Sequence, residues 1–250
     1  MTKIIESDEI FEIDVVKKIK SINYTIKDFT QSQGHGLFWD SEIRDKVFGL
    51  PSCKNDTKKY DICYSENKYD MEENISIKTS SNNNIDCGDI LRFYNGDFTH
   101  KYTIILIRYV QKDCQKQIKQ IIEINYNDEL RNYLFGTITE EILTNYVNAI
   151  KAIPKGNVSE EIKKTYKKLK TQLQQMYNMN INISPKVVSK SQRRVQCSIT
   201  KIDELLKKFP QNIISQTCEP IIRGVPITCN IKSEPRKRNS KIKSTIPSVK

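Results

Sequence analysis

The stretch KYDICYSENKYDMEENISIKTS, residues 59–80, carries the pattern from which the fold of the chain is predicted. In KYDICYS the aromatic and aliphatic residues share one face of a strand and leave Asp61 on the other. In NISIKTS two isoleucines share a face, which leaves Ser76 and Lys78 opposite. The acidic segment between these runs completes a predicted β-hairpin. A register that pairs residue 61 with residue 76 or 78 puts Asp61 and Lys78 on one face.

The segments on either side of the hairpin predict a mixed α/β core. Two later runs, YTIILIRYV (102–110) and KQIIEINY (119–126), are hydrophobic nearly throughout, as central strands covered on both faces are. A carboxylate buried in such a strand needs a cationic partner, so Glu123 either has one or faces solvent. Upstream, SQGHGLFWDSEIRDKVFGL (32–50) predicts an amphipathic helix, and downstream DCGDILRFYNG (86–96) predicts a short one. We therefore expect an α/β sandwich with a mixed sheet flanked by helices.

A basic, mainly helical portion is predicted from residue 137 onward. TITEEILTNYVNAIKAIP begins with the capping-box spacing of Thr137 and Glu140, and SEEIKKTYKKLKTQLQQMYN predicts a helix capped by Ser159 or Asn157. KSQRRVQCSI then alternates as a strand does, with its polar residues outward. We expect three parts: an α/β core (1–136), a basic helical and strand portion packed on it (137–230), and a basic, flexible tail (231–250).

Charge and cysteine content limit the class of protein. Residues 1–150 hold 19 Lys and Arg against 24 Asp and Glu, a net charge of −5, whereas residues 151–250 hold 22 against 6, a net charge of +16. This asymmetry is typical of a protein that handles a polyanion, although a solvated surface with a basic tail has the same composition. No apolar run is long enough to span a membrane, and the N-terminus lacks a signal-peptide pattern. Seven scattered cysteines without a Cys-x-x-Cys pair favour reduced thiols in the cytoplasm over zinc or disulfides.

A hairpin that places one aspartate beside one lysine provides half of a site for phosphodiester hydrolysis. A divalent metal in such a site bridges the scissile phosphate and lowers the pKa of an attacking water. Mg²⁺ binds one or two carboxylates together with waters and phosphate oxygens. A nearby lysine adds positive charge that orients the water and stabilises the developing negative charge. Asp61 and Lys78 are the candidates for these roles, although an edge-strand lysine is also a common solubilising feature.

This arrangement resembles the PD-(D/E)XK nuclease superfamily, to which many type II restriction endonucleases belong. The resemblance covers roughly residues 34–126. Within them, YD…SIK lies where that fold carries its Asp strand and its acid-x-Lys strand, and FWDSEIRDKVF lies where many members place an additional glutamate. The resemblance implies a restriction-endonuclease-like fold, Mg²⁺ as cofactor, and catalytic roles for Asp61 and Lys78, with Glu42 on the preceding helix as an auxiliary acid.

The sequence departs from the superfamily pattern at Ser76, which replaces the acid two positions before the lysine. Some members with Ser-x-Lys supply the missing carboxylate from the following helix, about a dozen residues downstream, and this implicates Asp89. Glu42 and Glu73 are the competing acids. The resemblance thus implies a metal site made by Asp61 with Asp89 or Glu73. From the residues alone, Asp89 could instead pair with the arginine three positions on, and the fold could persist as a nuclease that only binds.

Two sets of side chains are candidates for contact with DNA. Arginine can donate two parallel hydrogen bonds to guanine and glutamine can pair bidentately with adenine, so Arg193, Arg194 and Gln196 are predicted to read bases. Other cations suit phosphate contacts, which give salt-dependent affinity without sequence information. The candidates for phosphate contact, each of which could equally be a solvated charge, are Lys163, Lys167, Arg236 and Arg238.

The function expected from the sequence is Mg²⁺-dependent hydrolysis of double-stranded DNA at a short specific site, as in type II restriction enzymes. A homodimer is expected because one hydrolytic centre cuts one strand and a twofold pair cuts both. The alternatives are a structure-selective repair or junction nuclease and a non-catalytic nucleic-acid-binding protein.

Overall fold

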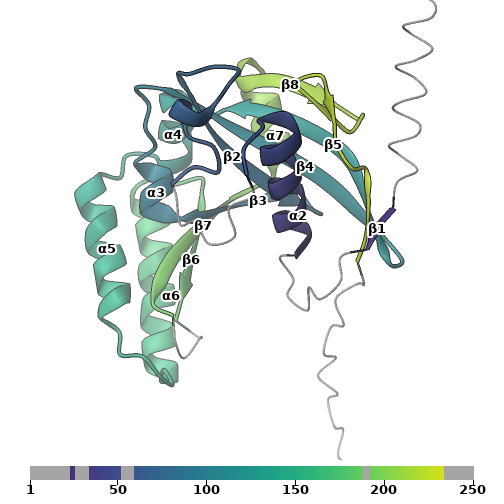
Figure 1. Ribbon diagram of the computed structural model, residues 1–250. Helices are drawn as coiled ribbons and strands as arrows, with labels where there is room; N and C mark the ends of the chain where they lie inside the picture. Colours follow the sequence, from purple (N-terminus) through teal and green to yellow (C-terminus); the bar gives the residue numbers. More distant parts are fainter. Residues whose placement is uncertain (1–22, 26–33, 52–58, 188–191, 234–250) are drawn as a thin grey trace, which may run out of the picture.

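A computed structural model describes residues 23–25, 34–51, 59–187 and 192–233; Figure 1 draws the rest as a grey trace. Its centre is a curled mixed sheet in the order β1-β11-β5-β4-β2, in which β8 also pairs with β5. Strand β4 is parallel to β2 and antiparallel to β5. The mixed sheet flanked by helices that the sequence predicts is confirmed. The strands of this sheet are β1 (Asn23–Thr25), β2 (Glu73–Ser80), β4 (Lys101–Lys112), β5 (Gln115–Asn125), β8 (Ile213–Thr217) and β11 (Asn230–Lys232).

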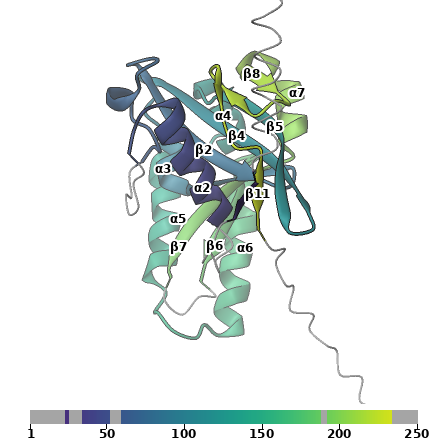
Figure 2. The same cartoon turned by 45° about the vertical axis from the view of Figure 1, so that its right-hand side comes forward.

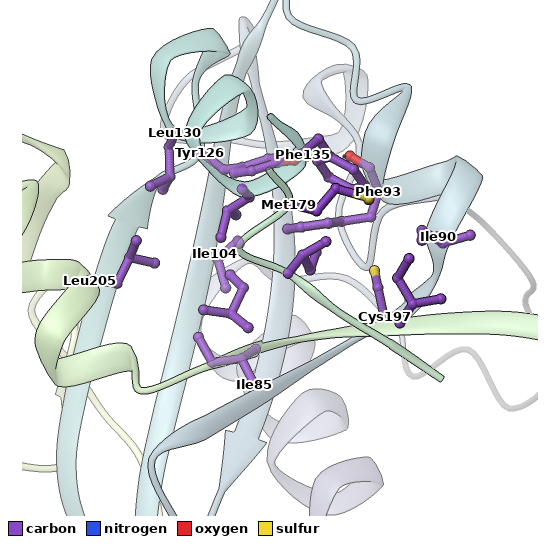
Figure 3. Packing of buried hydrophobic residues seen from close by; sticks show 14 of the residues in the cluster. Ile85, Ile90, Phe93, Ile104, Tyr126, Leu130, Phe135, Met179, Cys197 and Leu205 are labelled. Atoms are coloured by element: carbon purple, nitrogen blue, oxygen red, sulfur yellow. Dashed lines mark hydrogen bonds between the residues drawn. The ribbon is translucent and has the colours of Figure 1, made fainter. Parts of the chain in front are cut away.

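Strand β4 lies inside the sheet, and its side chains alternate between two hydrophobic clusters. Tyr102, Ile104 and Leu106 belong to the larger cluster on one face of the sheet. Ile105 and Ile107 belong to the smaller cluster on the other face. Burial of one large aliphatic side chain contributes about 1.5 to 3 kcal/mol, so this apolar run is stabilised by cover on both faces, as predicted. Figure 3 shows part of the larger cluster.

Helix α2 (Gly34–Glu42) covers the smaller cluster and continues into a π-helical turn, Ile43–Val47. The predicted amphipathic helix is therefore confirmed. Its apolar stripe is fully buried, from Trp39 through Ile43 to Val47. Figure 2 shows α2 in front of the main sheet, with β6 and β7 below it.

A second sheet, in the order β3-β7-β6, is antiparallel and packs one face on the larger cluster. Its strands are β3 (Asn84–Asp89), β6 (Asn182–Lys186) and β7 (Arg194–Thr200). The predicted alternation is confirmed in β7, where Val195, Cys197 and Ile199 are buried. The polar residues between them, Gln196 and Ser198 among them, lie on the outer face and are half-buried. This second sheet therefore presents a polar face away from the core.

The basic portion holds the helices α5 (Glu140–Ala152), α6 (Glu160–Met176) and α7 (Ile202–Lys208). It also holds β6, β7, β8 and β11 and a small antiparallel pair, β9 (Ile221–Ile222) and β10 (Val225–Pro226). Ser159 caps α6 as predicted, since its Oγ accepts from the Ile162 N–H at 3.3 Å. The cap predicted at Thr137 is wrong, because Thr139 caps α5 instead. The Thr137 N–H donates to the Tyr177 carbonyl and the next side chain is buried, so the helix begins two residues later.

The junction before this portion requires a glycine. Helix α4 (Asp128–Phe135) ends at Gly136, whose φ is +62°. A Cβ at Gly136 would collide with the carbonyl oxygens of Tyr177 and Asn178. Only glycine combines this backbone conformation with this close approach.

Two local predictions around the opening stretch are wrong. Residues 59–63 do not form a strand: Ile62 makes a single antiparallel bridge to Ile75, and a 3₁₀ turn follows at Tyr64–Glu66. The ladder stops because the next N–H, that of Ile77, bonds to a side chain. The predicted helix at 86–96 begins with the end of β3, and only α3 (Ile90–Tyr94) is helical.

Strands from the predicted parts 1–136 and 137–230 pair with one another in both sheets. The segment before residue 23 and the tail from residue 234, with Arg236 and Arg238, lie outside the described residues. Within the described ranges, no helix combines the length and apolarity needed to cross a membrane.

Candidate active site

Asp61 and Lys78 meet at the edge of the main sheet. The Ile62–Ile75 bridge places Asp61 opposite Ser76. The Oδ2 atom of Asp61 accepts hydrogen bonds from the Ile77 N–H at 2.6 Å and from Lys78 Nζ at 3.4 Å. The side chains of Lys78 and Asp61 are 26% and 31% exposed, so both remain accessible to a solute. The carboxylate–ammonium pair predicted from the hairpin is thus formed, although Asp61 does not lie in a regular strand.

Helix α2 brings a second carboxylate, Asp40, to this pair. Gly36 packs against β2, since a Cβ on it would lie 3.3 Å from Thr79 Oγ1. At the other end of the segment, the Arg44 guanidinium donates to the Asp61 carbonyl oxygen. Asp40 lies four residues from each of these contacts, which places it on the same face of the helix, toward Asp61. The site therefore combines Asp40, Asp61 and Lys78, with Arg44 behind them.

The Asp40 carboxyl is in an unfavourable environment for a charge. Its Oδ1 atom is buried and has no hydrogen-bond partner among the described residues. Burial and the negative charge of Asp61 raise the pKa of Asp40 to about 6, against partial compensation by Arg44 and Lys78. Buried polar atoms in native proteins are nearly always paired, so an unpaired carboxylate oxygen beside a second carboxylate is a candidate ligand for a cation.

Glu42, the acid predicted on this helix, points to the other side of it. Two residues along a helix correspond to a rotation of about 200°. Its carboxylate accepts from the N–H of Thr228 at 3.0 Å and from Thr228 Oγ1 at 2.6 Å, and pairs with Lys46 at 2.6 Å. Glu42 is buried. In the described structure it fixes the segment around Thr228 against α2.

Glu73 lies at the opposite end of β2 from Lys78, about 16 Å away along an extended strand. Arg223 donates to both of its carboxylate oxygens, at 2.7 and 2.8 Å, and also to Glu123 at 3.0 Å. Burial raises the pKa of Glu73, but hydrogen bonds from Arg223 and Thr103 outweigh it and hold that pKa below its usual value. The cationic partner required for Glu123 is therefore Arg223, and both glutamates belong to a buried ion-pair network.

The other two predicted site residues have local partners. Asp89 caps α3, because its Oδ1 accepts from the N–H groups of Leu91 and Arg92, both at 3.1 Å. Ser76 is buried, and its Oγ lies 3.1 Å from the Tyr102 hydroxyl. Neither residue is joined to Asp61 by a hydrogen bond in the described structure.

The chemistry of the donor set fits Mg²⁺ with two protein ligands. In the described part of the chain, no three His, Cys, Asp or Glu side chains converge as a metal-binding group. Mg²⁺ does not require three, since it commonly keeps several waters and binds one or two carboxylates together with substrate phosphates. Asp40 and Asp61 meet that requirement, and the unpaired Oδ1 of Asp40 is the atom that a cation would satisfy.

The predicted DNA-contacting residues are placed differently from one another. Arg193 is buried, and its guanidinium donates to backbone carbonyls, including those of Ile153, Pro154 and Gly156. Lys163 pairs with Glu160 at 2.6 Å on the exposed surface of α6. The remaining candidates within the described residues, Arg194, Gln196 and Lys167, are not held by any hydrogen bond or ion pair of their side chains there.

Sequence reasoning missed Asp40, although a signal for it was present. Gly36, Asp40 and Arg44 recur every four residues, and the glycine permits close approach of the helix to a strand.

No protein-family model, curated protein or solved structure matches this chain.

Proposed function

We propose that this protein is a Mg²⁺-dependent endonuclease that hydrolyses double-stranded DNA at the site formed by Asp40, Asp61 and Lys78. The observation that carries the proposal is the meeting of three groups at the edge of β2. These are the Asp61 carboxylate, the Lys78 ammonium 3.4 Å from it, and the buried, unpaired Oδ1 of Asp40. In this proposal Asp40 takes the place on the helix that the resemblance to restriction endonucleases had given to Glu42.

Each group of the site has a distinct role in this proposal. Asp40 and Asp61 would hold Mg²⁺, which when bound lowers the pKa of an attacking water and offsets negative charge on the phosphate. Lys78 Nζ, anchored by Asp61 Oδ2, orients the water and stabilises the negative charge that develops on the phosphate oxygens. Arg44 holds the backbone of Asp61 through its carbonyl and so positions the carboxylate.

The choice of DNA as substrate rests on charge. The net charge of +16 in residues 151–250 favours a polyanion, and lysines 163, 164, 167 and 168 lie on α6. A restriction-endonuclease-like architecture, cutting at a short specific sequence, and action as a homodimer follow from the resemblance and from the need to cut both strands. The basic portion supplies the phosphate contacts in this proposal.

The test is incubation of supercoiled plasmid with the protein and Mg²⁺, compared with Asp61→Asn, Lys78→Met and Asp40→Asn. Each substitution should lower the cleavage rate about 100-fold or more, as loss of an acid–base or electrostatic group does. The matched controls are Asp45→Asn and Lys119→Met, which change exposed residues of the same types and should cut as the parent does.

The products distinguish the alternatives. Discrete fragments support a site-specific endonuclease, whereas a smear supports a structure-selective or nonspecific nuclease. Plasmid that stays intact, with salt-dependent binding retained, refutes catalysis and leaves a nucleic-acid-binding protein. Asp89→Asn and Glu73→Gln test the acids that the resemblance implicates, and unchanged cutting by both would restrict the metal site to Asp40 and Asp61.

A further inference from the structure

A polar pocket of about 320 Å³ opens where the end of β2 meets the outer face of the β3-β7-β6 sheet. Thr79 of β2 and Tyr109 of β4 line it from the main sheet, and Gln196 and Ser184 line it from the second sheet. The pocket adjoins the candidate active site. Thr79 follows Lys78 in β2 with its side chain on the opposite face of the strand, and it touches Gly36, one helical turn of α2 from Asp40.

The lining of the pocket selects for a neutral polar ligand. Most of the lining side chains are amides and hydroxyls, and the only charged ones among the described residues are Asp86 and Lys186. A phosphate site would need several cations or backbone N–H groups, and a cation would meet one carboxylate that shares the pocket with a lysine. An apolar ligand would find polar walls on most sides. Amides carry both a donor and an acceptor, so they complement heterocycles that do the same.

Some of the lining side chains are held by hydrogen bonds, and others have no hydrogen-bond partner among the described residues. Ser80 Oγ donates to the Asn82 carbonyl at 2.9 Å, and Asn182 Nδ2 donates to Ser198 Oγ at 3.1 Å. These bonds hold the walls. In contrast, the side chains of Gln196, Ser184 and Lys186 have no hydrogen-bond partner among the described residues, which leaves their donors and acceptors for a ligand.

We infer that this pocket holds one nucleobase of the nucleic-acid strand that is cut at the adjacent carboxylate–lysine site, and that the Gln196 amide binds the edge of that base. The inference rests on the proposed function and specifies where sequence is read. A base enters a pocket when it is unpaired or when it is extruded from the duplex, and polar edges and an aromatic wall are the features that receive it. Tyr109 provides the aromatic wall, and Gln196 provides the paired donor and acceptor.

The chain carries its own reporter for this pocket. Trp39 is the single tryptophan of the sequence, and its ring lies 5.6 Å from that of Tyr109. The four deoxynucleoside monophosphates are titrated into metal-free protein and Trp39 fluorescence is followed at the red edge of its absorption. Deoxyribose 5-phosphate, which lacks a base, is titrated in parallel. At least one nucleotide should give a saturable change in fluorescence, and deoxyribose 5-phosphate should give none.

Variants test the residue assignment. Gln196→Ala should weaken the best nucleotide about tenfold or more, because a bidentate amide–base contact is lost. Ser184→Ala is the second pocket variant, and it should also weaken binding. Gln216→Ala is the matched control, since this glutamine is exposed on β8, away from the pocket, and the variant should bind nucleotide as the parent does.

A duplex and a single strand that both carry 2-aminopurine then identify the source of the base. Brightening in the duplex indicates extrusion, and brightening in the single strand alone indicates an unpaired base.

The inference is overturned if no nucleotide changes Trp39 fluorescence, if deoxyribose 5-phosphate binds as well as nucleotides, or if Gln196→Ala binds as the parent does. Its failure is separable from failure of the proposed function. Lys78→Met should abolish cutting and leave nucleotide binding intact, whereas Gln196→Ala should weaken nucleotide binding and change the sequence preference of the cutting that remains. If the protein binds nucleotides but cuts no DNA, the inferred base pocket stands and the proposed nuclease function is refuted.

Discussion

Replacing Asp40 with asparagine should make the folded protein more stable at neutral and higher pH, even though it removes a proposed catalytic group. Asparagine has the shape of the protonated carboxyl and carries no charge. Burial and the neighbouring Asp61 raise the pKa of Asp40 from 3.8 to about 6. Because the folded-state value is raised, the stability contributed by this carboxyl is fully present below a pH of about 3.8 and is lost as the pH rises through about 6.

The size of the effect follows from the same two values. At about 1.4 kcal/mol per pH unit, the difference between 3.8 and about 6 corresponds to about 3 kcal/mol. Asp40 is half-buried, so solvent screening reduces the expected gain of Asp40→Asn to about 1 to 3 kcal/mol at pH 8. Near pH 4 the parent is itself protonated at this position, and the gain should fall close to zero.

Urea denaturation with EDTA, followed by Trp39 fluorescence at a series of pH values, measures this difference. Asp45→Asn, an exposed change five residues along the same segment, is the control and should shift stability by less than about 0.5 kcal/mol at every pH. The reasoning is refuted if Asp40→Asn is less stable than the parent at pH 8, or if its gain is as large at pH 4. Mg²⁺ in place of EDTA should stabilise the parent and leave Asp40→Asn unchanged, since only a ligand that binds the folded state adds stability.

Three further substitutions test the framework around the site. Arg223→Met should destabilise the fold by about 3 to 5 kcal/mol, measured by urea denaturation, because it leaves Glu73 and its neighbouring glutamate buried without a cation. Arg193→Ala should lower stability by about 1 to 3 kcal/mol through the carbonyls it leaves unpaired, whereas the exposed Arg194→Ala should leave the urea midpoint unchanged and alter DNA binding alone. Gly136→Ala should cost at least about 1 to 3 kcal/mol from its positive φ, measured as a drop in Tm, and an unchanged Tm would contradict the steric account.

The elements predicted from the sequence are those whose pattern reflects burial. The runs that became β4 and β5 are apolar at nearly every position because both faces are covered, and α2 shows its stripe because one face is covered. The predicted hairpin is wrong for a reason that the alternation of apolar and polar residues does not reveal. The Asp61 carboxylate takes the Ile77 N–H that would have continued the ladder, so the first strand ends after one bridge.

The candidate site was predicted in part, for similar reasons. Asp61 and Lys78 lie close in sequence, and their pairing depends only on a local register. The choice between Glu42 and Asp40 depends instead on the rotational setting of α2, which is fixed by Thr228 and the Trp39 hydrogen bond to its carbonyl. Those contacts span 186 and 189 residues and leave no local signal. Arg193 was predicted to read bases because its carbonyl partners lie 37 to 40 residues away in the sequence and also leave no local signal.

The attachment of α2 to Thr228 also determines when during synthesis the site can exist. A ribosome that has made α2, β2 and the Asp61 segment has produced all three proposed reactive side chains, but the segment around Thr228 that fixes the helix is still to come. Contacts of such long range form late because their loop-closure entropy must first be overcome. Under the proposed function, the nascent chain therefore lacks its assembled site until translation has passed the segment at Thr228.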